Sequence, residues 1–552
     1  MELDRRSFLK GSLVAGAAAV TGSTALAGCA PNGSTGVGSG ATNAGDEYVP
    51  SFMQREPVGE PEETVTADFV ICGAGGCGLA ALIQADDLGL NAILLEKKAQ
   101  AGGTFDFAAM SFFPNNKYAI EAGFKVDYND LIKTIMTYNH YIPSYTLLKN
   151  YMSETPETFD WCEALGIQFM YMKPQPGQPG PFGLGVSAAF AGGTGEGGTG
   201  GGSAAVKVLV AEVEKRGLDI RYNTPAKELT QDADGKITGV LAIDETGKVI
   251  KFEAPAVLLC TGGWGSNPDF IRDLAKVDPD RVISPGYDGR DGDGVYMARK
   301  AGCAWARGDG TMMFYGPHIP GPTWGEALNT GVYQPTLWVN EKGHRFMNEG
   351  LGNFAETGNA IRDVKRLFVI QASPDLDTIT SDDGIAGFGA SGAGGSESPK
   401  DKYKEKLEEE IARGNDHIFV AESIADLAAI TGMDPAVLQA TVDRYNELYA
   451  KGEDEDFQKD ARYLTPIETG PFYAFECCDG FFTTIGGVKI DEEIRGIDED
   501  GNVIEGLYVA GCDTGALCGD IYDFTSAPGE QSSWALTSAR LVAKHVAAKL
   551  NG

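Results

Sequence analysis

The residues from Thr64 to Glu96 constrain the fold more than any other part of the sequence. An apolar run ends in a glycine-rich turn, a segment with helical spacing of its apolar residues follows, and a second apolar run ends at Glu96. This pattern predicts a strand, a glycine turn, a helix and a second strand that ends in an acid. A bound dinucleotide requires these parts in this order. An ordinary glycine turn is the alternative, but it does not explain the flanking runs and the terminal acid.

Each part of the turn has a predicted role. Gly73 permits the tight turn, Gly75 lets the backbone approach a pyrophosphate, and Gly78 lets the helix pack against the strand. The free N–H groups and the positive dipole end of the helix then face the phosphates. Glu96 lies 18 residues past Gly78, at the right distance to accept hydrogen bonds from a ribose. We therefore predict that the ligand contacts Gly73, Ala74, Gly75, Gly76, Cys77, Gly78, Glu96 and Lys97.

Length, charge and cysteine spacing limit the class of protein. A chain of 552 residues is too long for one ordinary core, so we expect two or more domains. The net charge of -33 repels nucleic acid and anionic lipid, and we expect neither as a partner. This acidity suits docking to a basic protein, although solubility alone explains it equally well. The ten cysteines include no C-x-x-C pair and no C-x-x-C-H, so we expect no metal centre and no covalently attached haem.

The first 29 residues have the features of an export signal. Residues 4–10 carry the twin arginine and Phe-Leu-Lys of a Tat signal, and a weakly apolar stretch follows. That stretch is too short and too rich in glycine and alanine for a comfortable membrane span. It ends in Leu-Ala-Gly-Cys at Cys29, which resembles a bacterial lipobox. We expect an exported protein that is attached to the membrane only through a lipid on Cys29, with residues 30–63 as a flexible tether. A plain Tat signal with cleavage nearby is the alternative.

Further glycine-rich segments follow later in the chain. Residues 101–104 form a small-residue loop, and residues 191–202 form either a loop near the active site or a floppy linker. The runs at 218–226 and 237–242 predict strands of a small meander. Near the C-terminus a strand at 506–511 precedes a long helix at 531–550. Pro528 and Gly529 stand directly before this helix, so its first N–H groups are expected to point outward.

As a set, these segments resemble the flavoprotein family of fumarate reductases and 3-oxosteroid dehydrogenases. The resemblance spans about residues 64–548 and rests on residues 73–78, 96, 102–104, 261–263, 292–294, 338–349 and 506–511. It implies an α/β fold, with a Rossmann-like FAD-binding domain built from both chain ends and an inserted α+β capping domain. The implied domain boundaries are 64–312 and 476–552 for the FAD-binding domain and 313–475 for the cap. Beyond the first turn, the resemblance assigns FAD contacts to Gly102, Gly103, Thr104, Ala226, Thr261, Gly262, Gly263, Asp293, Asp513, Gln531 and Ser532.

The resemblance also implies that the cations of a fumarate site are missing. Reduction of an activated C=C bond needs a hydride donor, a group that polarises the substrate and an acid that protonates the other carbon. Fumarate reductases supply the last two mostly with arginines. The relay acid falls near Asn329 here, and the three arginines fall near Val332, Asn353 and Ser526. A buried dicarboxylate without these cations is strongly disfavoured, so we do not expect fumarate as the substrate. The resemblance gives Arg345 a structural role.

The polar residues that remain near these positions are neutral or aromatic. Tyr333 falls in the relay stretch of the cap, His318 near the substrate-binding histidine of the family, and Tyr473 where the chain re-enters the FAD-binding domain. Tyr522 lies just before the last helix, near a tyrosine of the steroid branch, although strict spacing puts Thr525 there. A phenol can donate to an enone carbonyl or protonate a carbanion-like carbon. We predict catalytic roles for these three tyrosines and the histidine, and for each the alternative is an ordinary core or surface side chain.

These observations predict an exported, lipid-anchored FAD enzyme that reduces an activated C=C bond in a neutral or aromatic small molecule of the enone or acrylate type. Because the chain has no haem motif, we expect a separate redox protein, such as a cytochrome, to supply the electrons. A 3-oxosteroid-type FAD dehydrogenase and an FAD-binding lipoprotein without catalysis are the two alternatives. Glu530, at the start of the last helix, is expected to cap that helix.

Overall fold

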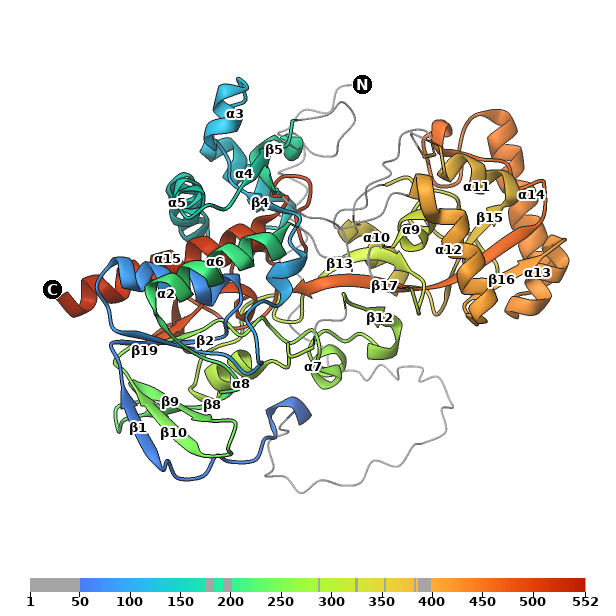
Figure 1. Cartoon of the computed structure of the whole chain (residues 1–552). Coiled ribbons are helices and arrows are strands. Elements are labelled where there is room, and N and C mark those ends of the chain that lie inside the picture. Colours follow the sequence, from blue (N-terminus) through green and yellow to red (C-terminus); the bar gives the residue numbers. More distant parts are fainter. Residues whose placement is uncertain are drawn as a thin grey trace, which may run out of the picture. The chain divides into compact units, whose positions relative to one another are not determined.

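The computed structural model describes residues 50–173, 182–191, 201–285, 288–322, 326–351, 354–381, 384–385 and 399–551 (Figure 1). The predicted export signal, most of the tether, the centre of the glycine-dense segment and Asn353 lie outside these residues. Within them, no helix is both long enough and apolar enough to cross a membrane.

A six-stranded sheet forms the base of the predicted FAD-binding domain. Its strands, in spatial order, are β18 (Arg495–Ile497), β19 (Val503–Val509), β11 (Val257–Leu259), β2 (Phe69–Cys72), β3 (Ala92–Leu95) and β7 (Asp219–Arg221). All neighbours pair in parallel except β18 and β19. The central strands β2, β3 and β11 are buried along their whole length, as in sheets covered on both faces. Because β19 from the end of the chain lies beside β11, the domain is built from both chain ends, as predicted.

Helices and a second sheet accompany this parallel sheet. The helices α2 (Gly76–Asp87), α6 (Gly202–Arg216) and α15 (Glu530–Asn551) pack side by side (Figure 1). The second sheet contains β1 (Glu63–Thr66), β10 (Val249–Glu253), β9 (Ile237–Ile243) and β8 (Ala226–Gln231), and the last three form an antiparallel meander. The prediction was wrong for the start of this meander, because β7 pairs in parallel with β3 as the next strand of the dinucleotide unit.

A smaller antiparallel sheet packs near the C-terminal helix. It consists of β4 (Met110–Phe112), β6 (Ser187–Phe190) and β5 (Phe169–Tyr171). The helices α3 (Lys117–Glu121), α4 (Tyr128–Tyr138) and α5 (Tyr145–Ala164) occur between β4 and β5 in the chain, and both α5 and β4 contact α15. Two further helices, α7 (Pro268–Asp273) and α8 (Asp293–Lys300), follow β11. These contacts fix the start of α15, which is important for the site described below.

The cap is built around another mixed sheet. Its strands are β12 (Val282–Ile283), β13 (Met312–His318), β14 (Leu337–Asn340), β15 (Leu367–Ala372), β16 (Ile418–Ala421) and β17 (Phe472–Thr484). Its helices are α9 (Ala327–Val332), α10 (Phe354–Arg362), α11 (Ser373–Ile379), α12 (Pro399–Arg413), α13 (Ile424–Thr431) and α14 (Pro435–Lys451). Alternate residues of β14 and β15 belong to two separate hydrophobic clusters, so both faces of the sheet are buried.

One strand crosses the predicted boundary between the cap and the second part of the FAD-binding domain. β17 begins beside β15 and β16 in the cap sheet and continues to Thr484, which pairs with Met312 at the start of β13. The predicted boundary at residue 475 therefore lies inside a continuous strand. β13 and β17 together connect the cap to the rest of the chain.

Candidate functional site

A long cleft opens at the carboxyl ends of β2, β3 and β11, where ligands of parallel α/β sheets bind. Its empty space, including the open mouth, is about 1460 Å³. Predicted FAD contacts that line it are Gly73, Gly75, Gly76, Cys77, Glu96, Lys97, Gly102, Gly103, Thr104, Ala226, Thr261, Gly262, Asp293, Gln531 and Ser532. The other four predicted contacts, Ala74, Gly78, Gly263 and Asp513, are not among the residues that line it.

The first glycine turn is as tight as the sequence predicts. Gly73 has φ +109°, and a Cβ built on it would lie 2.6 Å from the Cys260 carbonyl oxygen. A Cβ on Gly78 would overlap the Gly73 carbonyl oxygen, so Gly78 permits the contact between α2 and β2 without facing the cleft. No side chain caps the start of α2 at Gly75. The first N–H groups of α2 are thus available to an anion in the cleft.

The carboxylate of Glu96 holds two loops at the cleft edge. Oε2 accepts a hydrogen bond from the Ala74 N–H at 2.7 Å, and Oε1 accepts one from the Lys98 N–H at 2.8 Å. Each carboxylate oxygen can accept a second hydrogen bond. Glu96 can therefore bind a ribose hydroxyl while it still orients the turn. Ala74 serves the site through this backbone contact.

A second glycine loop lies against the first. The Gly102 N–H donates to the Ala74 carbonyl at 3.0 Å, and both Gly102 and Gly103 have φ above +100°. A Cβ on Gly75 would lie 3.2 Å from the Gly102 carbonyl oxygen, so the two backbones approach more closely than most side chains allow. A pyrophosphate requires free backbone N–H groups and glycines whose missing side chains let the backbone come close, and the adjoining ribose requires an acid. The residues present fit this cofactor.

Two buried aspartates hold loops of the cleft in place. Asp513, in the short turn after β19, accepts hydrogen bonds from the N–H groups of Thr261 and Gly263 at 2.6 and 2.8 Å. Burial raises the pKa of this carboxyl to about 6. Asp293 forms ion pairs with Lys97 and Arg55, and although burial opposes it, these cations hold the pKa of Asp293 below its ordinary value. In this structure, then, Asp513 positions the 261–263 turn, and Asp293 holds Lys97.

The start of α15 forms another part of the cleft wall. Gly529, Gln531 and Ser532 line the cleft, and the Ser532 hydroxyl is bonded to the Met110 carbonyl at 2.6 Å. The structure also brings Tyr522 here. The side chain of Tyr522 is 2% exposed, and its hydroxyl oxygen accepts the Gly529 N–H at 2.9 Å.

The other three candidate catalytic residues do not line the cleft. Tyr315 stacks on Tyr333 and contacts His318, with ring centroids 5.4 and 5.0 Å apart, and its ring also makes a T-shaped contact with the cleft residue Phe482 at 5.2 Å. His318 and Tyr333 thus lie together behind the wall. Burial lowers the pKa of His318 to about 4, so this histidine is neutral.

Tyr473 lies in the cap sheet, where it pairs with Gln371 of β15 and Val420 of β16. The cleft residue Phe482 lies nine positions after Tyr473 in β17, which at ~3.3 Å per residue is about 30 Å. The chain leaves the cap sheet later than the resemblance implied, and we therefore exclude Tyr473 from the candidate site.

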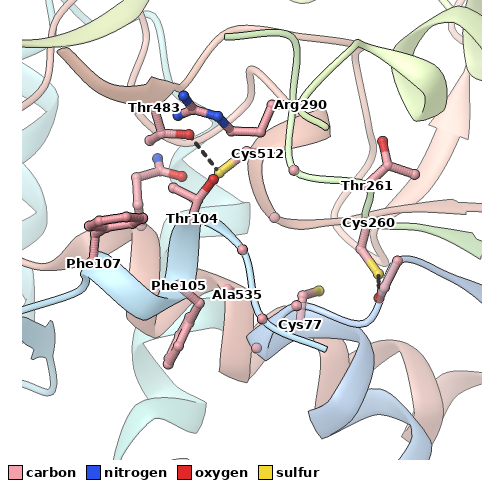
Figure 2. Close-up of a pocket in the computed structure, with 18 of the residues that line it drawn as sticks. Cys77, Thr104, Phe105, Phe107, Cys260, Thr261, Arg290, Thr483, Cys512 and Ala535 are labelled. Atoms are coloured by element: carbon pink, nitrogen blue, oxygen red, sulfur yellow. Dashed lines mark hydrogen bonds between the residues drawn. The ribbon is translucent and has the colours of Figure 1, made fainter. Parts of the chain in front are cut away.

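Sequence reasoning missed the apolar wall of the cleft. Phe107, Met313, Phe482 and Phe524 line it together with Tyr522, and they come from four distant segments. It also missed Arg290, Thr483 and Cys512, which are close together in Figure 2. Arg290 donates to the Phe482 carbonyl and to Ser284, both at 2.8 Å, and Thr483 donates to the Cys512 sulfur at 3.3 Å. The sequence offered one signal for three of these residues, namely their proximity to predicted ones. Arg290 lies near Asp293, Phe524 near Tyr522, and Cys512 next to Asp513.

The described residues at the positions of the missing relay acid and arginines have structural roles here. The Asn329 side-chain oxygen accepts the Ile319 N–H at 2.8 Å, Val332 belongs to a hydrophobic cluster of the cap, and the Ser526 N–H donates to Asp523 at 2.8 Å. Asn353 lies outside the described residues.

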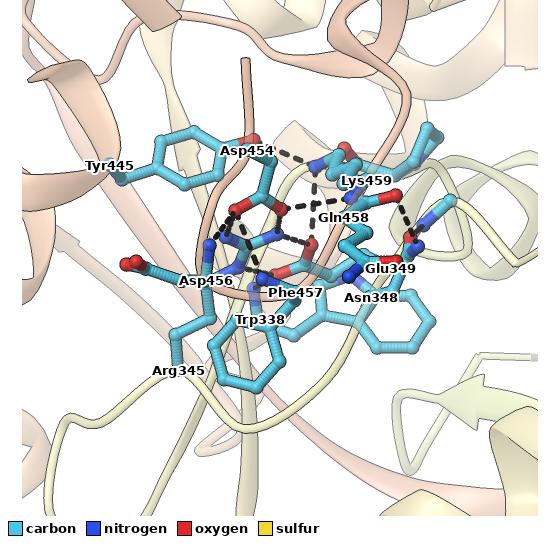
Figure 3. Close-up of polar contacts among 12 residues, drawn as sticks. Trp338, Arg345, Asn348, Glu349, Tyr445, Asp454, Asp456, Phe457, Gln458 and Lys459 are labelled. Atoms are coloured by element: carbon cyan, nitrogen blue, oxygen red, sulfur yellow. Dashed lines mark hydrogen bonds and ion pairs between the residues drawn. The ribbon is translucent and has the colours of Figure 1, made fainter. Parts of the chain in front are cut away.

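Arg345 belongs to a buried ionic cluster of the cap (Figure 3). Its guanidinium pairs with Glu349 at 2.8 Å and with Asp454 at 2.7 Å, and Lys459 lies 3.3 Å from Glu349. Burial lowers the pKa of Lys459 to about 8, although Glu349 opposes the shift. The Lys459 ammonium also donates to the carbonyls of Pro335 and Thr336, so the cluster fixes the turn after α9. Its position agrees with the structural role expected for Arg345.

The fold and the cleft define a flavoprotein oxidoreductase. A family model described as an FAD binding domain matches residues 68–526, and a model of the Tat signal sequence matches residues 2–22. The chain belongs to the FAD-binding family that includes fumarate reductases and 3-ketosteroid dehydrogenases. It is an FAD-dependent oxidoreductase that acts on CH–CH groups, and its Tat signal indicates export.

Individual relatives differ in the substrates that they are named for. Vinyl phenol reductase of Lactiplantibacillus plantarum is 30% identical over 494 residues, which cover 87% of this chain and 96% of that protein. Fumarate reductase (cytochrome) of Shewanella frigidimarina is 29% identical over 498 residues, which cover 88% of this chain and 79% of that protein. The crystal structure of 3-ketosteroid delta1-dehydrogenase from Sterolibacterium denitrificans has the same fold, with a TM-score of 0.71, 19% identity and coverage of 88% of this chain and 100% of that one.

Proposed function

We propose that this protein reduces an activated C=C bond in a neutral or aromatic small molecule, of the aryl-vinyl, acrylate or enone type. The observation that carries the proposal is the apolar wall of Phe107, Met313, Phe482 and Phe524, which lines the same cleft as Tyr522. The aromatic rings and the methionine of this wall favour a flat conjugated substrate. The name of the relative from Lactiplantibacillus plantarum, a vinyl phenol reductase, supports the same substrate class.

The charges of the cleft support a substrate without two carboxylates. Among the described residues that line it, the cations are Lys97, Lys98 and Arg290. Lys97 is paired with two aspartates, and Arg290 donates to Phe482 and Ser284. An arginine that grips a developing charge contributes ~2–4 kcal/mol to turnover. Without such groups at the positions of Val332 and Ser526, dicarboxylate reduction should be negligible.

The chain's own residues would then bind, polarise and protonate the substrate. Bound FAD in its reduced form supplies the hydride. The cleft wall orders the conjugated system, and the Tyr522 hydroxyl donates to the substrate because its oxygen already accepts the Gly529 N–H. We propose that the electrons come from a separate redox protein, since the sequence has no C-x-x-C-H motif. We also propose lipid attachment at Cys29 after Tat export.

Mixing the reduced protein with single acceptors tests the substrate class. The FAD-loaded protein is reduced with an artificial one-electron donor and mixed with a vinylphenol, an arylacrylate, a cyclic enone, a 3-oxosteroid or fumarate. We expect aryl-vinyl or enone acceptors to reoxidise the flavin and fumarate to leave it reduced. Tyr522→Phe should lower turnover while FAD stays bound, and the matched control Tyr473→Phe should not. Robust fumarate reduction by the wild type would defeat the proposal, and an unaffected Tyr522→Phe variant would remove Tyr522 from it.

A further inference from the structure

A short segment that precedes the dinucleotide unit is docked on the predicted FAD-binding domain. Its residue Phe52 is 5% exposed and stacks on Phe270 of α7, with ring centroids 4.2 Å apart. The Ser51 hydroxyl donates to the Asp273 carboxylate at the end of α7, at 2.9 Å. We call residues 51–55 the N-terminal strap, because they make these specific contacts although they fall inside the predicted tether.

The last residue of the strap reaches the start of α8. The Arg55 guanidinium forms an ion pair with Asp293 and donates to the Asp291 carbonyl at 3.0 Å. It also lies 4.5 Å from the centre of the Tyr296 ring, a favourable position for a cation. Asp293 is 8% exposed and lines the cleft. A buried carboxylate of the cleft wall is therefore bound by a cation from a segment 238 residues away in the sequence.

Lys97 binds the same carboxylate from a third segment. Its ammonium lies 2.7 Å from Oδ2 of Asp293 and 2.8 Å from Oδ2 of Asp291, while Arg55 pairs with Oδ1 of Asp293. Lys97 lines the cleft and directly follows Glu96, the acid at the cleft edge. A buried carboxylate is costly to ionise unless cations compensate its charge. Asp293 thus joins the strap, the loop after β3 and the start of α8 in one ionic cluster.

The loop of residues 288–293 is the part of the cleft wall that these contacts position. Most of its residues line the cleft, and it ends where α8 begins. Gly292 packs closely on the Phe270 ring, since a Cβ built on it would lie 2.6 Å from a ring carbon. Phe270 is the ring on which Phe52 of the strap stacks. The strap therefore acts on this loop directly through Arg55 and indirectly through the Phe270 ring.

We propose that the N-terminal strap is a clamp that retains the bound FAD, with Arg55 as its positioning residue. Arg55 is not among the residues that line the cleft, and it acts through Asp293 and Lys97, which do line it. Together the ion pairs hold the loop of residues 288–293 against the loop that carries Glu96. Loss of the Arg55 charge leaves Asp293 with one cation, so the loop moves more easily and FAD leaves faster. The clamp requires FAD binding but not the substrate class proposed above.

The rate of FAD release tests the clamp without any substrate. FAD-loaded protein is diluted, and the change in flavin fluorescence on release gives the dissociation rate. Arg55→Gln, which removes the charge, should release FAD about ten-fold faster or more. Arg55→Lys, which keeps a cation, should restore most of the retention. The matched control is Arg272→Gln, at an exposed arginine of α7 that pairs with Asp269, and it should release FAD at the wild-type rate.

A second measurement uses the wild type and needs no variant. If the strap holds the bound FAD, then FAD must stabilise the docked strap to the same extent. The N–H groups of Met53 and Gln54 donate to backbone carbonyls within this segment, so their hydrogen exchange reports on its order. Removal of FAD should speed exchange in residues 51–55 several-fold and leave exchange in α14 of the cap unchanged. Wild-type release in Arg55→Gln, no restoration by Arg55→Lys, or equal exchange in the strap with and without FAD would overturn the proposal.

Discussion

Replacing Glu530 with Gln should make the protein more stable, and the gain should grow with pH. The folded-state pKa of Glu530 is about 8 against an ordinary value of 4.5, so the folded protein binds more protons than the unfolded chain between these values. The free energy of unfolding therefore decreases as pH rises through this window. One pKa step corresponds to about 1.4 kcal/mol, so the full displacement is worth roughly 5 kcal/mol at most. A glutamine has nearly the same shape and no charge to bury.

The assay is the melting temperature of the FAD-loaded wild type and variant between pH 4.5 and 8.5. Below the window both side chains are neutral, and the two Tm values should nearly agree. Across the window the variant's advantage should widen by several degrees, because a stability gain raises Tm. A Tm difference between wild type and Glu530→Gln that does not change with pH would refute the reasoning, since it would mean that the carboxyl does not titrate on unfolding.

Three other substitutions test the glycine turn that binds FAD, the cap and the export signal. Gly78→Ala should yield FAD-free or insoluble protein because its Cβ overlaps the Gly73 carbonyl. The control Gly59→Ala, whose Cβ makes only an ordinary van der Waals contact, should bind FAD normally. The flavin absorbance of the purified proteins distinguishes these outcomes. Lys459→Met should lower stability by about 3–5 kcal/mol because it breaks a buried ion pair, and a denaturant titration that shows less than ~1 kcal/mol would contradict this. Replacing both Arg5 and Arg6 with Lys should leave the protein in the cytoplasm, and normal export of that variant in a fractionation assay would contradict the Tat assignment.

Local sequence patterns were sufficient to predict the glycine turn and the acid at the cleft edge. A glycine turn between two apolar runs fixes strand, turn and helix through contacts within about thirty residues. The structure accordingly has the tight turn at Gly73, the close approach at Gly75 and the carboxylate of Glu96 at the cleft edge. The start of α15 was also predicted, because proline and glycine before a helix are local signals.

The apolar wall and the burial of Glu530 could not be predicted in the same way. Phe107 and Phe482 line one cleft although they are far apart in the sequence, and no local pattern brings them together. Glu530 was expected to cap its helix, but tertiary contacts with Tyr151 and Cys518 bury it instead. Tyr473 was misplaced because the length of β17 depends on its pairing with the cap strands. In each case the deciding interaction is long-range.

The absence of the fumarate-site arginines and the position of Tyr522 together bear on which group donates the proton in the proposed reaction. Where fumarate reductases carry cations, this chain has the buried Val332 of the cap core and Ser526, whose N–H binds Asp523. A site without those cations has to recognise its substrate by shape and apolar contact, and its proton has to come from a neutral acid. A buried phenol gives up its proton reluctantly, and burial raises the pKa of Tyr522 well above its ordinary value. In the proposed function, the Gly529 N–H at the start of α15 offsets part of that cost, and the acid lies in the loop before the helix that lines the cofactor cleft and not in the cap.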